Sequence, residues 1–205
     1  MFVAHPRRRS QAPALAGLLL LGLLSLAGGA SATQLEPLDL GALTARASHI
    51  VVGVVEGQRA LWSDAARSSI VTEVRVRVTR GMRGAREGEV VTLRRLGGSV
   101  DGIGMRVVGE AGFSVGEEVL LFAEPRGEAL SAVGMAQGKL HVATEGGRKV
   151  VYGSLAGAEL VPGAGAARAA ATAGPRPLDD VLREVAALVQ QKAPSKAAAP
   201  ARGAK

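Results

Sequence analysis

Strict alternation of apolar and charged residues is the feature that most constrains the fold of this chain. Val74, Val76 and Val78 alternate with the charged residues Glu73 and Arg75 and their neighbour at position 77. Successive side chains of a β-strand point to opposite faces of a sheet, so this pattern places valines on one face and charges on the other. The segment therefore predicts an antiparallel strand with one face buried and one face in water.

Short apolar runs with few charges predict the rest of a sheet. They lie at residues 50–55, 90–93, 118–122, 131–135, 139–144 and 149–152. Turn-forming glycines punctuate these runs, and no helical pattern intervenes between them. Strands at this spacing favour a mainly β fold, namely a small antiparallel barrel of about five to six strands.

Three details refine this prediction. Gly53 interrupts the first apolar run, which indicates a bulge or a close approach of another backbone. Residues 57–69 are largely polar and are interpreted as a loop that carries the single tryptophan, Trp62. The glycine-rich segment 97–116 is interpreted as a long connection, either a binding surface over the barrel mouth or a crossover that only permits strand twist.

Two helices are predicted beside the barrel. A short one near the start would present Leu35, Leu38, Leu40 and Leu43 on one face, with Asp39 as its cap. The second spans 178–191 and is amphipathic, with an apolar stripe that we expect to pack on the barrel. The stripe consists of Leu178, Val181, Leu182, Val185, Leu188 and Val189.

The two ends of the chain differ from the middle. A basic stretch through Arg9 leads into a mostly apolar segment, 14–27, and then into Ala30-Ser31-Ala32, which fits the pattern of a cleaved signal peptide at 1–32. The apolar run is about 14 residues long, whereas a membrane span needs roughly 20. We therefore expect a protein exported to the periplasm or the medium.

Composition shifts to Ala, Gly and Pro after Pro162, which marks a domain boundary. The interpretation is a barrel domain at 33–162, a linker at 163–177, the helix, and a disordered basic tail at 192–205. The net charge of +7 belongs to the ends, because residues 33–162 contain 15 basic and 15 acidic residues. This balance and the 2% aromatic content argue against a nucleic-acid partner.

Several segments together resemble a known type of domain. They are residues 49–55, a hairpin at 72–84, the block from Gly97-Gly98 to Phe122, and Gln137-Gly138-Lys139-Leu140. These motifs resemble an uncharacterised exported bacterial domain that is similar to the OB-like barrel of the netrin and metalloproteinase-inhibitor type. The resemblance implies an OB-like barrel over roughly 48–144. It does not imply metalloproteinase inhibition, because the chain has no Cys to match the zinc-chelating N-terminal Cys of that family.

Candidate functional residues are few, and none forms a recognisable catalytic set. Ser48 and His49 are adjacent at a helix–strand junction, where we expect their side chains to point in different directions. The acidic residues around the glycine-rich segment match no calcium-loop spacing. We therefore expect no catalytic activity, no metal and no cofactor. Possible partner-binding residues are Trp62, Arg94, Arg95, Asp101 and Arg106.

Two interpretations of the arginines remain open at this point. Arg94 and Arg95, with Arg75, Arg77 and Arg80, form either a basic stripe or an ordinary solvated face. The function expected is a non-enzymatic binding or accessory module whose barrel loops contact a protein or polysaccharide partner. The alternatives are a regulator of a secreted peptidase and a cell-surface structural protein tethered electrostatically by its basic tail.

Cleavage after Ala32 predicts a mature chain that begins at Thr33. Signal peptidases accept only small residues at the last and third-last positions of the leader, so Ala32→Lys should leave the precursor uncleaved. Intact-mass analysis of the exported protein measures both forms, with Thr33→Ser as a control outside the recognised positions. Recovery of the wild-type chain with residues 1–32 still attached would contradict the prediction.

Overall fold

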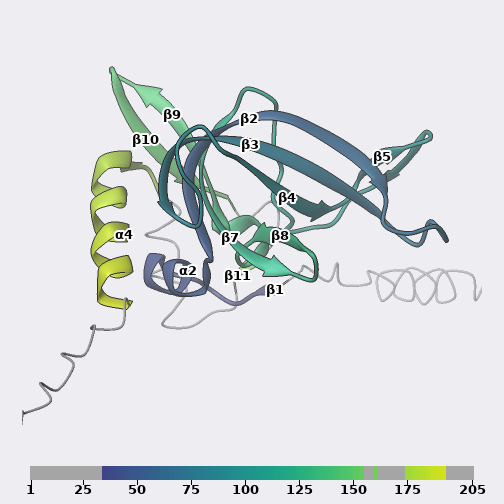
Figure 1. Cartoon of the computed structure of the whole chain (residues 1–205), viewed down its shortest axis with the longest axis horizontal. Coiled ribbons are helices and arrows are strands. Elements are labelled where there is room, and N and C mark those ends of the chain that lie inside the picture. Colours follow the sequence, from purple (N-terminus) through teal and green to yellow (C-terminus); the bar gives the residue numbers. More distant parts are fainter. Residues whose placement is uncertain (1–33, 155–158, 161–173, 193–205) are drawn as a thin grey trace, which may run out of the picture. The chain divides into compact units, whose positions relative to one another are not determined.

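The computed structural model describes residues 34–154, 159–160 and 174–192 (Figure 1). The predicted signal peptide at 1–32, most of the linker and nearly all of the basic tail lie outside these residues. The described elements are β1 (Gln34–Leu35), α2 (Leu40–Arg46), β2 (His49–Trp62), β3 (Ile70–Arg83), β4 (Val90–Leu96), β5 (Gly98–Val100), β6 (Ile103–Met105), β7 (Glu118–Arg126), β8 (Ala129–Ala132), the 3₁₀ turn η1 (Met135–Gly138), β9 (Lys139–Glu145), β10 (Arg148–Gly153), β11 (Glu159–Leu160), β12 (Arg176–Pro177) and α4 (Leu178–Lys192).

One eight-stranded sheet dominates the fold, which confirms the mainly β prediction. Its strands follow the order β12-β10-β9-β7-β2-β3-β4-β8. Strand β8 also pairs with β7, and its single pairing with β4, at Leu93 and Leu130, is parallel. The hydrogen-bonded neighbours therefore run from β7 through β2, β3, β4 and β8 and return to β7.

Strands β2 and β7 are buried on both faces. Ile50 and Val52 point into one cluster of buried side chains, whereas Val51 and Val55 point into another. Strand β7 divides in the same way, and this is why both strands are apolar at consecutive positions. We call the first cluster the helix-side core and the second the inner core.

The inner core is formed by the inward side chains of the strands that follow one another around the sheet. The alternation found in the sequence is confirmed, because Val74, Val76 and Val78 are buried in this core. The charged residues between them lie outside, at the expected positions. Strand β4 adds Val91 and Leu93.

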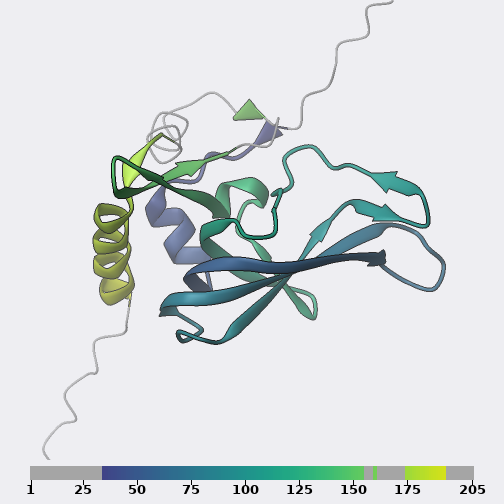
Figure 2. The ribbon, with the colours of Figure 1, turned by 90° about the horizontal axis from the view of Figure 1, so that it is seen from above.

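The two helices cover the helix-side core. Asp39 caps α2 as predicted, and its carboxylate accepts a hydrogen bond of 2.8 Å from the Ala42 amide. Helix α4 buries Leu178, Val181, Leu182 and Val185 in the same core, so its apolar stripe packs on the sheet and on α2. Figure 2 shows the two helices side by side. An ion pair of 2.7 Å between Arg176 and Glu184 joins β12 to the second turn of α4.

The predicted close approach of another backbone at Gly53 is confirmed. A Cβ atom at this position would lie 2.5 Å from the carbonyl oxygen of Arg77 on the neighbouring strand. The register between β2 and β3 shifts between Val52 and Gly53, which is the mark of a bulge. The extra residue at this shift is Thr79, so the bulge lies on β3 opposite Gly53.

Three predictions of local structure were wrong. Residues 57–62 are the outer part of β2, because Gln58 to Trp62 pair one by one with β3 and need no buried side chains to do so. Leu35 lies in β1, since α2 begins only at Leu40. The end of the expected linker forms β12, which pairs with β10.

Truncating the α4 stripe should destabilise the whole sheet domain. Leu182 is 2% exposed, so Leu182→Ala leaves a cavity between α4 and the helix-side core and should lower the free energy of unfolding by about 2–5 kcal/mol. Chemical denaturation measures this value. Gln190→Ala, an exposed change on the same helix, is the control and should be nearly neutral. Equal effects of the two variants would mean that α4 does not contribute to the core.

Candidate functional site

A two-glycine turn after β4 starts the site. Gly97 and Gly98 have φ values of 91° and 138°, a region that favours glycine. A Cβ atom on Gly98 would lie 2.5 Å from Oγ1 of Thr72, and that hydroxyl donates a buried 2.6 Å hydrogen bond to the carbonyl of Gly97. The chain therefore leaves β4 sharply and enters the hairpin of β5 and β6.

The tip of this hairpin is tied to the turn between β2 and β3. Nε1 of Trp62 donates a 3.1 Å hydrogen bond to the carboxylate of Asp101. The guanidinium of Arg67 lies 5.6 Å from the centre of the Trp62 ring and 3.8 Å from the same carboxylate. Two of the predicted partner-binding residues, Trp62 and Asp101, therefore contact each other. Trp62 ends a strand, not a polar loop as predicted.

The second half of the glycine-rich segment is anchored to the domain. Ala111 and Phe113 are buried in the inner core, 1% and 8% exposed. The amide of Ala136 donates a 2.9 Å hydrogen bond to the carbonyl of Gly109, and the side-chain amide of Gln58 donates to the carbonyl of Phe113. The segment is therefore a hairpin followed by a pinned loop, not one irregular connection as predicted.

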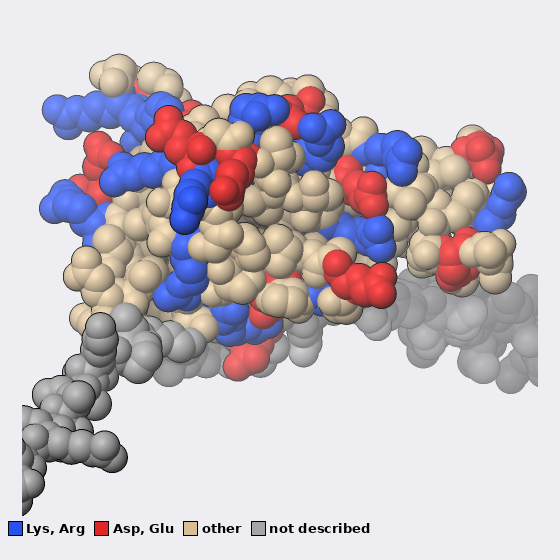
Figure 3. All heavy atoms as spheres, viewed as in Figure 1, with Lys and Arg blue, Asp and Glu red and all other residues tan. Residues whose placement is uncertain are grey.

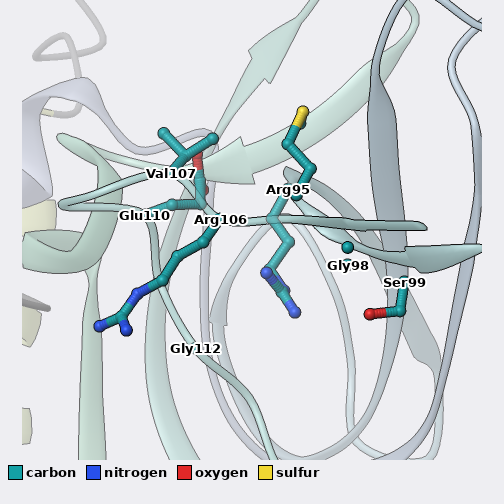
Figure 4. Close-up of a pocket in the computed structure, with 9 residues that line it drawn as sticks. Arg95, Gly98, Ser99, Arg106, Val107, Glu110 and Gly112 are labelled. Carbon is teal, nitrogen blue, oxygen red and sulfur yellow. The ribbon is translucent and has the colours of Figure 1, made fainter. Parts of the chain in front are cut away.

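A hollow of about 540 Å³ lies between the β5–β6 hairpin and the pinned loop, and we call it the Arg95 pocket. It brings together two predicted residues, Arg95 from β4 and Arg106 from the loop. In Figure 4 the guanidinium of Arg95 points into the space between Ser99 and Arg106. Its lining consists of Arg95, Gly98, Ser99, Gly104, Met105, Arg106, Val107, Glu110 and Gly112.

Glu110 is the buried ionisable group of this pocket. It is 8% exposed, and its Oε2 atom has no hydrogen-bond partner. Burial raises the pKa of Glu110, because a carboxylate loses its hydration there. The amides of Leu96 and Ala111 and the charges of Arg126 and Arg95 oppose this rise without cancelling it. Burial also lowers the pKa of Arg95, against the favourable charge of Glu110.

A second hollow, of about 200 Å³, shares Arg95 and Glu110 with the Arg95 pocket. Arg94 and Arg126 also line it. The Nη2 atom of Arg94 lies 2.8 Å from a carboxylate oxygen of Glu73. Arg94, one of the five residues predicted to bind a partner, therefore lines the second hollow, and its guanidinium is already paired with a carboxylate.

The outer face of the sheet is a mixed surface, not a basic stripe. Glu56 contacts both Arg75, at 2.6 Å, and Arg77, at 2.7 Å. With the pair between Arg94 and Glu73, three of the five arginines of the expected stripe contact a carboxylate. Figure 3 shows blue and red side chains interspersed over this view.

A second polar cluster surrounds Glu117. Its Oε1 atom lies 2.5 Å from Nζ of Lys139 and 3.0 Å from Nδ1 of His141, and its Oε2 atom accepts a hydrogen bond from the Ser114 amide. Burial opposes ionisation here, but hydrogen bonds led by that of Lys139 outweigh it and lower the pKa of Glu117. The Lys139 ammonium also lies 5.0 Å from the ring centre of Phe113. This cluster holds the end of the pinned loop against β9.

The side chains of Ser48 and His49 were predicted to point in different directions, and this prediction was wrong. Their side chains meet, with 2.9 Å between Oγ of Ser48 and Nδ1 of His49. The same hydroxyl lies 3.3 Å from the carbonyl of Ala123, and a Cβ atom on Gly84 would lie 2.7 Å from the His49 ring. The pair therefore packs into the junction between α2, β7 and the end of β3.

Arg95 and Arg106 were predicted from the sequence as partner-binding residues, but Glu110, which lines the same pocket, was not. The only local signal was a glutamate between small residues, Gly109 and Ala111, inside a glycine-rich segment. Its burial depends on contacts with β4 and β7, which are distant in sequence. No local pattern could have distinguished it from the exposed glutamates nearby.

The chain matches no model of a known protein family, no curated protein and no solved structure. Over the described part of the chain, no three His, Cys, Asp or Glu side chains are grouped in a way that could hold a metal ion. Within the same residues, no helix has the length and apolar character needed to cross a membrane.

Replacing Glu110 should change how stability depends on pH. Because its pKa is raised in the folded chain, its contribution to the free energy of unfolding is present below the ordinary pKa of Glu and is lost as pH rises through the raised value. The glutamine of Glu110→Gln does not ionise, so this variant does not lose stability in this way as pH rises. Its stability relative to wild type should therefore increase as pH rises from the ordinary pKa of Glu through the raised value, as measured by urea denaturation over a series of pH values.

The matched control is Glu128→Gln, an exposed carboxylate on the second hollow. It removes the same charge from the same region without removing a buried group. A relative stability of Glu110→Gln that stays constant with pH, or that follows the control, would show that Glu110 ionises as an ordinary surface residue.

Proposed function

We propose that the chain is an exported, non-enzymatic binding module that holds a partner protein on the surface of the segment 97–116. The observation that carries this proposal is the position of the exposed apolar side chains. Exposed large hydrophobic residues in the described part of the chain are Ile103, Val108 and Val115, at 55%, 42% and 63%, and Val90, at 36%. Three of these four lie on the one segment that also forms the Arg95 pocket.

Exposed apolar side chains favour a protein partner over a polysaccharide. Burying such a side chain against another apolar surface is favourable by about 25 cal/mol per Å², whereas a hydroxyl-covered glycan offers little apolar surface. The segment is also suited to binding because Ala111 and Phe113 anchor it, so little order has to be gained when a partner docks. A regulator of a secreted peptidase is one kind of protein that would act in this way.

We propose further that the sheet forms an OB-like barrel of the netrin type. The circuit of β2, β3, β4, β8 and β7, with its parallel contact between β4 and β8, supports this finer assignment. OB-like barrels bind ligands on the face of their second and third strands and at the adjacent loops. The Arg95 pocket adjoins β4, which is the third strand of the circuit.

Site-specific photo-crosslinking tests the proposed function. A photoreactive residue at Ser99, which is exposed beside the pocket, should give a discrete protein adduct when the full chain is exported by the cells that produce it. The triple variant Ile103→Ser, Val108→Ser, Val115→Ser should reduce the adduct about tenfold, because the exposed apolar contacts are lost. Gel shift and mass spectrometry of the adduct provide the measurement.

Val90→Ser is the matched control, because Val90 is an exposed large hydrophobic residue outside the segment. It should leave the adduct unchanged. An adduct that is equally strong in the triple variant would contradict the proposal. So would a chain that gives no protein adduct and instead remains attached to purified envelope polysaccharide.

A further inference from the structure

Several arginines on the outer face of the sheet have carboxylate partners: Arg75 lies 2.6 Å from Glu56, and Arg94 lies 2.8 Å from Glu73. The guanidinium groups of Arg95 and Arg106 have no carboxylate oxygen of a described residue within 4 Å. The same holds for Arg80, Arg83, Arg86, Arg126 and Arg148. What distinguishes Arg95 and Arg106 is that both line the Arg95 pocket.

The donors of Arg95 are poorly satisfied. Its Nε atom is buried and has no hydrogen-bond partner, and Nη1 makes one long bond of 3.3 Å to the carbonyl of Leu96. A guanidinium has five N–H donors in a planar fork, which matches the two oxygens of a carboxylate. A carboxylate or a phosphate could therefore accept two of these hydrogen bonds at once.

Glu110 limits the charge of what can bind. The charged residues that line the Arg95 pocket are Arg95, Arg106 and Glu110, so the lining carries one net positive charge when Glu110 is ionised. One added negative charge neutralises it. A second negative charge, as on a phosphate dianion, would be repelled by the carboxylate of Glu110. At a pH where Glu110 is ionised, the charge of the pocket therefore matches a single carboxylate.

We propose that the Arg95 pocket binds the carboxylate of an acidic side chain on the partner protein. This inference rests on the proposed function and adds the chemistry of the contact. Met105 and Val107 also line the pocket. The exposed Val108 follows Val107 directly, and the exposed Ile103 lies two residues before Met105. The matching partner segment is an Asp or Glu flanked by apolar residues.

The first test is an NMR titration of the full exported chain with a capped glutamate, N-acetyl-glutamate methylamide, whose only charge is the side-chain carboxylate. It should shift the amide signals of residues 98–112 with a dissociation constant on the order of millimolar, as expected for one carboxylate contact. The capped glutamine of the same shape should not. Shifts of equal size with the glutamine probe would overturn the proposal.

Variants connect the binding to the two arginines. Arg106→Gln changes an exposed side chain, so the fold should survive, and binding of the glutamate probe should weaken about tenfold. Arg95→Gln should abolish it. Arg75→Gln is the matched control, because Arg75 is already paired with Glu56, and it should bind as wild type. Unchanged binding in Arg106→Gln and Arg95→Gln would overturn the proposal.

Two further probes distinguish the source of the negative charge. Inorganic phosphate and an oligosaccharide of glucuronate should bind more weakly than the capped glutamate. Tighter binding of the oligosaccharide would overturn the assignment to a protein side chain. If crosslinking from Ser99 depends on the apolar residues but the glutamate probe does not bind, this inference fails alone. If the probe binds but crosslinking shows no dependence on them, the proposed function fails and the carboxylate contact stands.

Discussion

The burial of β2 and β7 on both faces is the constraint on which the rest of the structure depends. One face of each strand packs into the inner core, and the other packs into the core covered by α2 and α4. A central strand with no face in water must be apolar at every position, and Ile50 to Val55 and Val119 to Ala123 meet this requirement. The two cores are thereby joined through a shared pair of strands.

The outer ends of β2 and β3 extend beyond the two cores and support the β5–β6 hairpin. Beyond the cores, β2 continues through polar residues to Trp62, held by backbone pairing with β3. The β5–β6 hairpin contacts this extension, and Asp101 at its tip accepts the hydrogen bond of Trp62. The loop that follows returns to the inner core through Ala111 and Phe113. The pocket is therefore supported on one side by the hairpin and on the other by the core itself.

The positions of the charged side chains also follow from how the strands are arranged. Strand alternation sets charged side chains of neighbouring strands next to each other on the outer face. There Glu56 contacts Arg75 and Arg77 of β3, and Glu73 contacts Arg94 of β4. Arg95 follows Arg94 in sequence and so points to the other side, where it shares a pocket with Glu110. A shift of one residue in the register of β4 would exchange these two roles.

Local patterns were sufficient for the elements whose neighbours are close in sequence. The valines of β3 and the stripe of α4 follow periods of two and 3.6 residues, Asp39 is a typical cap residue, and the close approach at Gly53 follows from a glycine in an apolar run. Residues 57–62 were wrongly assigned to a loop, because this part of β2 is held by backbone pairing with β3 and has no buried side chains. The hydrogen bond from Trp62 to the tip of the β5–β6 hairpin could not be predicted from a local pattern either, because its acceptor, Asp101, lies 39 residues away in the chain.

The sequence by itself determined the β-rich architecture, the helix that covers it and the region in which a site would form. It did so because periodicity is a property of consecutive residues. Only the tertiary structure decided which arginines are neutralised, why Glu110 is buried, and that Arg95 and Arg106 face one pocket. These features depend on distances between residues of different strands and loops, and such distances are set by packing around the two cores.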